Sequence, residues 1–190
     1  MILEILKLLV DTVGALFVGA CLLRLWMQWL RIGMRNPLGE MVIALTDWIV
    51  RPLRRVVPGT GGVDWSSLIA AYLLAFFCVV LLAFSTSALI GVLRLPGADV
   101  FLGLALIWLV KWLLYVAFLV ILIGAVLSWA NPFSPVLPVF NALAAPLLRP
   151  IRRLFGPVGR FDFSPLVAAL IIEILLRVLQ AVSYNWLGTY

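Results

Sequence analysis

Histidine is absent from this chain, cysteine occurs only twice, and only 8 of the 190 residues are acidic. Without histidine, and without clustered cysteines or carboxylates at ligand spacing, the sequence offers no pattern typical of a metal site. It also has no glycine-rich phosphate-binding motif and no serine beside a plausible base. We therefore predict a protein that is not an enzyme and that uses no cofactor and no metal ion.

The two cysteines, Cys21 and Cys78, each lie within a long apolar run. Isolated cysteines in such runs usually behave as plain apolar residues. Neither a disulfide nor a redox role is predicted from them.

Charged residues make up only 12% of the chain, whereas hydrophobic residues make up 65%. Soluble domains are roughly a quarter charged, and the mean hydropathy here is +1.20. A helix that crosses the hydrocarbon core needs about 20 apolar residues, and the long continuous runs do not alternate as barrel strands do. The sequence predicts an all-α membrane protein with four transmembrane helices, at residues 2–30, 66–93, 100–129 and 165–187.

Most basic residues lie in two of the three connections between these spans. These are Arg31, Arg35, Arg51, Arg54 and Arg55 after the first span, and Arg149, Arg152, Arg153 and Arg160 after the third. The other side offers only Arg94 and Lys7. Because arginine and lysine near span ends favour the cytoplasm, both basic connections are predicted to be cytoplasmic and both chain ends outside. The net charge of +6 then favours anionic lipid headgroups as partners, and no nucleic acid is expected.

The two basic connections resemble each other. Residues 51–71 align without a gap to residues 149–169, and 10 of these 21 positions are identical. Such self-similarity indicates a duplicated unit, with halves at residues 1–95 and 96–190 and basic loops at 31–63 and 130–161. Each half holds two spans, so both halves insert the same way up, as parallel repeats. We predict a four-helix bundle of two hairpins.

Each basic loop contains a short amphipathic pattern, at residues 38–52 and 138–149. Both are far shorter than a span, so they predict helices that lie on the membrane surface, and Pro146 is expected to kink or end the second. An Arg-Pro-x-Arg-Arg element follows at headgroup depth, where each arginine is worth about 1 kcal/mol against anionic lipid. The candidate lipid-binding or partner-binding residues are Arg51, Arg54, Arg55, Arg149, Arg152 and Arg153.

Asp64 and Asp162 directly precede the second and fourth spans in the two copies of the motif. An aspartate there is a good helix N-cap, typically worth about 1 kcal/mol. It also lies within reach of an arginine of the preceding element, which would lock the loop to the span. An ion-binding pair of aspartates is the alternative interpretation, and the cap with its ion pair is favoured.

Four ionisable residues lie inside the spans, about 10 to 18 residues from the cytoplasmic ends and so within about 12 Å of one another in depth: Asp11, Lys111, Glu173 and Arg177. Charges in hydrocarbon normally face a partner or a water path, and small-residue seams predict that these point into the bundle. A structural ion-pair cluster is favoured, and the polar lining of an ion path is the alternative. Arg24, near the inner end of the first span, is predicted to snorkel.

The doubled basic loop and the run Gly159-Arg160-Phe161-Asp162-Phe163-Ser164-Pro165-Leu166 resemble the YggT family, also called YlmG-like proteins. The likeness covers essentially the whole chain, although Ser67 replaces the proline in the first copy and Pro58-Gly59 is reordered. The resemblance implies a bacterial inner-membrane protein, or a chloroplast relative, without an established reaction. It also implies links to osmotic and potassium homeostasis, cell division or nucleoid organisation, and cytochrome maturation.

Two functions are consistent with these features. In the favoured one, the protein is a membrane organiser or assembly factor whose basic cytoplasmic face binds anionic lipid or partner proteins. In the other, a homo-oligomer conducts or regulates ions such as potassium through the intramembrane charges.

Overall fold

The computed structural model describes residues 2–59, 62–90, 97–155 and 162–188, and it is all-helical. Its six helices are α1 (Ile2–Trp29), α2 (Pro37–Val56), α3 (Trp65–Ile90), α4 (Ala98–Ala130), α5 (Leu137–Phe155) and α6 (Ser164–Gly188). The predicted boundary between two halves, at residues 95 and 96, lies outside the described residues.

Four of the helices are long and apolar enough to cross a membrane, and they match the four runs predicted from the sequence. Their membrane-length segments are Glu4–Trp29, Trp65–Ser85, Ala98–Ala130 and Ser164–Tyr184. The helices begin within two residues of the predicted starts. The last residues predicted for the second span, 91–93, lie outside the described part of the chain.

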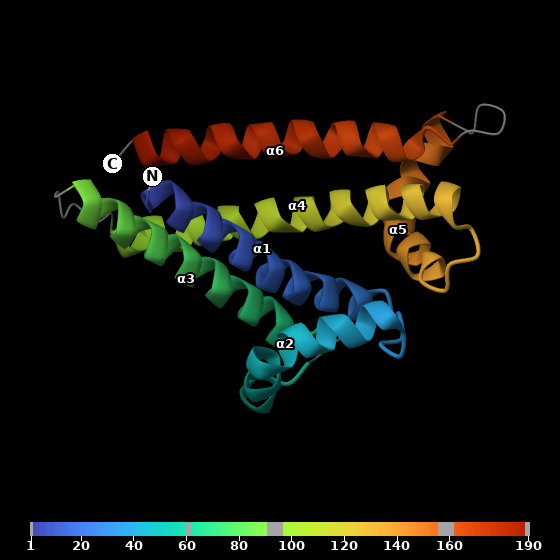
Figure 1. Ribbon diagram of the computed structural model, residues 1–190, viewed down its shortest axis with the longest axis horizontal. Coiled ribbons are helices and arrows are strands. Elements are labelled where there is room, and N and C mark those ends of the chain that lie inside the picture. The colour runs from blue at the N-terminus through green and yellow to red at the C-terminus, as the bar shows by residue number, and fades with distance from the viewer. Residues whose placement is uncertain (1, 60–61, 91–96, 156–161, 189–190) are drawn as a thin grey trace.

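Helix α4 is the centre of the molecule, because it contacts α1, α3, α5 and α6. Helices α1 and α3 pack as one pair, and α6 lies along α4 on the side away from α3 (Figure 1). The four long helices therefore pack as an open arrangement, in which α6 contacts mainly α4 and α5. Apolar helices gain no hydrophobic driving force from contact with one another inside lipid, so α6, with its many exposed Leu and Ile side chains, needs no second neighbour.

The short helices α2 and α5 lie at the same end of the molecule, opposite the start of α1 and the end of α6 (Figure 1). Asn36 caps α2: its side-chain oxygen accepts a hydrogen bond from the Gly39 backbone N–H at 2.9 Å. The first half of α5 buries Phe140, Leu143 and Ala144 in the largest apolar cluster, which also draws residues from α1, α2, α4 and α6. This end of the molecule holds the most extensive core.

Both short helices continue beyond the predicted ends. Helix α2 runs through Pro52 to Val56, and α5 runs through Pro146 and Pro150 to Phe155, so the prediction that Pro146 could end the helix is wrong. A proline removes one hydrogen bond and frees the carbonyl four residues earlier. Pro52 and Pro150 are exposed, so water or headgroups can bond that carbonyl. The Arg-Pro-x-Arg-Arg elements are consequently helical.

Candidate functional site

The two copies of the basic motif make the same ion pair. In the first, Arg54 Nη2 of α2 lies 2.6 Å from Asp64 Oδ2, just before α3. In the second, Arg152 Nη2 of α5 lies 2.7 Å from Asp162 Oδ2, just before α6. Each pair joins the end of a short helix to the start of a long one, as the sequence predicted. The structure places these four residues where they fix the short helices relative to the spans.

Asp64 occupies the predicted N-cap position of α3. Its backbone carbonyl accepts hydrogen bonds from the N–H groups of Ser67 and Leu68, at 3.1 and 3.2 Å. Its carboxylate Oδ2 accepts a further bond from the Ser67 hydroxyl at 2.6 Å. Burial alone would raise the pKa of this carboxyl, but the Ser67 bonds and the charge and hydrogen bond of Arg54 outweigh burial and hold the pKa below its usual value. Asp64 is therefore charged at neutral pH.

Asp162 lies one residue earlier relative to its helix, because α6 begins at Ser164. Its Oδ1 accepts the backbone N–H of Ser164 at 2.9 Å, and Arg152 Nε donates to its Oδ2 at 2.9 Å. Burial is the largest single influence and raises the pKa of this carboxyl, but the bonds from Ser164 and Arg152 and the charge of Arg152 together outweigh it and lower the pKa. Unlike Asp64, this carboxylate is partly exposed.

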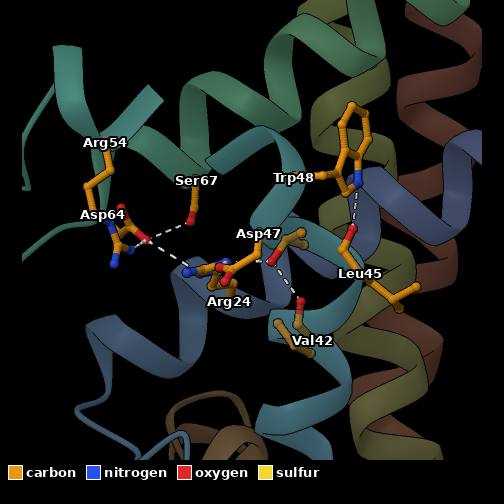
Figure 2. A network of polar contacts seen from close by, with 9 residues as sticks. Arg24, Val42, Leu45, Asp47, Trp48, Arg54, Asp64 and Ser67 are labelled. Carbon is orange, nitrogen blue, oxygen red and sulfur yellow. Dashed lines mark hydrogen bonds and ion pairs between the residues drawn. The ribbon is translucent and has the colours of Figure 1, made fainter. Parts of the chain in front are cut away.

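Arg24 is buried within this site, with only 5% of its surface exposed, so the prediction that it snorkels is wrong. Its Nη1 donates to Thr46 Oγ1 at 2.7 Å and to Asp47 Oδ1 at 2.9 Å, and its Nε lies 4.0 Å from Asp64 Oδ2 (Figure 2). Arg24 therefore links α1, α2 and the start of α3. The sequence signal was available: Thr46 lies between Val42 and Val50 on the buried face of α2, where a polar residue needs a partner.

The second half has no counterpart of this buried arginine. At the same offset of 98 residues, Leu122 and Ala144 stand opposite Arg24 and Thr46. An apolar cavity of about 380 Å³ lies between α4, α5 and α6 instead, with Arg152 and Asp162 among its few polar lining residues. Its apolar wall includes Phe118, Leu122, Leu148, Leu166 and Ala169.

The other arginines of the motif are exposed at the ends of the short helices. They are Arg51, Arg55, Arg149 and Arg153. Cations near a helix C-terminus complement its dipole, and none of the four has a described acidic partner within ion-pair distance. Their charge is available to an external anion. Arg160, also predicted for this face, lies outside the described residues.

The intramembrane charges do not form one cluster. Glu173 and Arg177 pair with each other at 3.0 Å on an exposed face of α6, so the prediction that they point into the bundle is wrong. Lys111 lies with its Nζ 5.2, 5.6 and 5.9 Å from the ring centroids of Trp108, Trp112 and Tyr115 on its own helix. Asp11 is half-buried on α1, and its Oδ1 has no hydrogen-bond partner among the described residues.

Within the described ranges, no group of three or more His, Cys, Asp or Glu residues could hold a metal ion. The aspartates of the motif are each engaged by arginine instead, which favours the ion-pair interpretation over an ion-binding pair. Asp64 is also the N-cap of α3, whereas Phe163 and not Asp162 occupies the N-cap position of α6.

Comparison with known proteins gives one consistent result. The sequence model of the family described as CCB3/YggT matches residues 3–85 and 103–183. The chain is 36% identical over 184 residues to "Uncharacterized protein YggT" of Escherichia coli (strain K12), covering 93% of this chain and 92% of that protein. It is 34% identical to "Uncharacterized protein in proC 3'region" of Vibrio alginolyticus, covering 85% and 86%. No solved structure matches.

Proposed function

Since the chain belongs to the CCB3/YggT family, we propose that it is a non-enzymatic organiser of the bacterial inner membrane. In this proposal the four apolar helices span the membrane, both chain ends lie outside the cytoplasm, and the end that carries α2 and α5 faces the cytoplasm. There the protein binds anionic phospholipid and gathers partner proteins. The links to osmotic stress, cell division and cytochrome maturation that the resemblance implies are compatible with a gathering role of this kind.

The proposal includes two parallel repeats. The matched segments 3–85 and 103–183 fall one in each half of the chain, which supports a duplication. The ion pairs Arg54–Asp64 and Arg152–Asp162, related by a constant offset, support it further. Two halves of like orientation bring both sets of arginines to one side of the membrane.

The exposure of arginines at the ends of α2 and α5 is the observation that carries the proposal. Arg51 and Arg55 lie in the last two turns of α2, and Arg149 and Arg153 lie in the last two turns of α5. Helix α2 also exposes Met41 and Trp48, which suits a helix lying in the membrane interface. At headgroup depth, each arginine contributes about 1 kcal/mol of attraction to an anionic leaflet.

The cavity between α4, α5 and α6 adds a second element to lipid binding. Its walls are mostly apolar, and Arg152 lies at its edge with Arg149 and Arg153 on the same helix. A bound phospholipid would place an acyl chain in the apolar cavity and its phosphate beside these arginines. The second half of the molecule is therefore the preferred place for a retained phospholipid.

Lipid retention provides the test. The protein is reconstituted in a mixture of phosphatidylglycerol and phosphatidylcholine, extracted in mild detergent, and the lipids that remain bound are identified by native mass spectrometry. We expect bound phosphatidylglycerol to exceed its share of the mixture. Replacing two arginines, Arg149→Gln with Arg153→Gln, removes about 2 kcal/mol of attraction and should lower its retention about thirtyfold.

The matched control removes the two basic residues that the sequence predicts on the opposite side of the membrane, Lys7→Gln with Arg94→Gln. This variant should retain phosphatidylglycerol as the unmodified protein does. Equal retention in the two double variants, or no preference for the anionic lipid at all, would contradict the proposal.

The alternative function, ion conduction by an oligomer, has weaker support. Glu173 and Arg177 lie on an exposed face of α6, while Lys111 lies against aromatic rings of α4. These positions offer no common path through the described part of one chain.

A further inference from the structure

A stripe that includes four polar residues runs along an exposed face of α6, a helix that is otherwise largely apolar. It consists of Leu170, Glu173, Arg177, Gln180 and Tyr184, all of them exposed. The residues are separated by three, four, three and four positions. This alternation is the a/d spacing of a helix that packs along a partner helix. We call these five residues the α6 seam.

The charges of the seam lie deep in the hydrocarbon. Glu173 and Arg177 are 9 and 13 residues after the start of α6, about 14 and 20 Å along a helix that rises 1.5 Å per residue. Their side chains are 53% and 77% exposed. Ionisable groups at such depth are costly unless they face a partner or water.

The pair within α6 satisfies these groups only in part. Arg177 Nε donates to Glu173 Oε1 at 3.0 Å. A guanidinium has five N–H donors, and within the described residues the two Nη groups of Arg177 have no acceptor. The seam thus presents unsatisfied donors on a surface that contacts neither α1 nor α3 to any extent.

We propose that the α6 seam packs against the α6 seam of a second copy of this chain. A two-fold axis along the membrane normal places two parallel α6 helices side by side with equal residues at equal depth. Each Arg177 then bridges its own Glu173 and the partner's Glu173, which gives a neutral ring of two acids and two bases. The Gln180 side chains bond one another across the axis.

Charge complementarity selects a second copy over other occupants. The seam carries one acid and one base in adjacent turns, so it is complementary to itself. A lipid tail offers no acceptor for Arg177. A polar residue at an a or d position also fixes the register of paired helices. The inference is independent of the proposed lipid binding, because the seam uses none of the cytoplasmic arginines.

Cysteine cross-linking in native membranes tests this inference. In a background of Cys21→Ala and Cys78→Ala, the variant Leu170→Cys places a thiol on the seam, and Val178→Cys places one on another exposed face of α6. Disulfides need Cβ atoms roughly 4 Å apart, so under mild oxidation we expect at least about tenfold more covalent dimer from Leu170→Cys than from Val178→Cys. Gln180→Cys, further along the seam, should behave like Leu170→Cys.

A second comparison, between two double variants, tests whether the Glu173–Arg177 ring holds the dimer together or whether the cross-linking reflects random collisions. Glu173→Ala with Arg177→Ala should lower the Leu170→Cys dimer severalfold, whereas the matched pair Leu175→Ala with Val178→Ala should leave it unchanged. Both remove side chains exposed in one copy, so neither needs the fold to rearrange. Equal cross-linking at Leu170 and Val178, cross-linking to a different protein, or indifference to loss of the charges would overturn the inference.

Discussion

Asp64 and Arg24 are opposite charges held together away from solvent, with side chains 1% and 7% exposed. Neither depends on the other alone: Asp64 also bonds Arg54 and Ser67, and Arg24 bonds Thr46 and Asp47. In such a network every member limits the freedom of the others. The result is a rigid junction between α1, α2 and α3, whereas Arg152 and Asp162 form a simpler pair at the junction of α5 and α6.

Neutralising the two aspartates should therefore have unequal effects. Asp64→Asn leaves Arg24 and Arg54 without their shared carboxylate in a buried site, which costs about 3 kcal/mol. For a chain of this size the apparent Tm in detergent should fall by roughly 6 to 12 °C. Asp162→Asn removes a partly exposed pair worth about 1 kcal/mol or less. Equal decreases in Tm for Asp64→Asn and Asp162→Asn would show that the buried network around Asp64 stabilises the fold no more than the exposed Arg152–Asp162 pair does.

The dependence of stability on pH follows from the lowered pKa of both aspartates. A carboxyl with a depressed folded-state pKa stabilises the fold at pH values above its unfolded pKa, about 4, and this contribution is lost as pH falls through the folded pKa. The Tm difference between the unmodified protein and Asp64→Asn should be constant from pH 8 to about pH 5 and shrink below about pH 4. A difference that already shrinks near pH 6 would contradict this assignment.

Among the individual residues, the sequence predicted contacts within the repeated motif, but it did not predict the contacts of Arg24. Arg54 and Asp64 recur as Arg152 and Asp162, and in both copies the sequence placed the aspartate within reach of an arginine of the preceding element without indicating which one. Arg24 has no such repeat, and an arginine near the end of a span usually extends to the interface. Its partners come from α2, a helix whose placement against α1 cannot be read from local periodicity.

The hydrophobic pattern of the sequence predicts which segments are helical. Where each helix ends depends on the structural environment of its last residues. Continuous apolar runs gave four long helices, and amphipathic spacing gave α2 and α5. Pro146 was expected to kink or end the second short helix, but α5 continues through it to Phe155. The position of a proline in the sequence therefore does not fix where a helix ends.

Gly39, at the start of α2, tests how closely this helix must approach the turn after α1. A Cβ at Gly39 would overlap the Met34 backbone carbonyl, whereas a Cβ at Gly33 would meet nothing within 4 Å. Gly39→Ala should therefore cost about 1 to 3 kcal/mol, as overpacking usually does. Gly33→Ala, in the same turn, is the control and should leave the apparent Tm in detergent nearly unchanged. If the two variants melt alike, the turn is not packed as described.

The arrangement of the whole molecule was the least predictable feature. Apolar helices in lipid lack a hydrophobic force that would close them into a bundle, so hydropathy fixes the number of spans and not their neighbours. Here α4 holds the two helix pairs together, and α6 keeps most of its surface free. That open face carries Glu173 and Arg177, which a closed bundle would have buried.

The central claim is that the basic ends of both halves lie on the cytoplasmic side of one membrane. Labelling with a membrane-impermeant maleimide tests it most directly, with Arg55→Cys and Arg153→Cys as two single-cysteine variants. Both positions are exposed, and the native cysteines are removed in both variants by Cys21→Ala and Cys78→Ala. Both variants should be labelled in inside-out vesicles and protected in right-side-out vesicles. Labelling of Arg55→Cys and Arg153→Cys from opposite sides of the membrane would contradict the account.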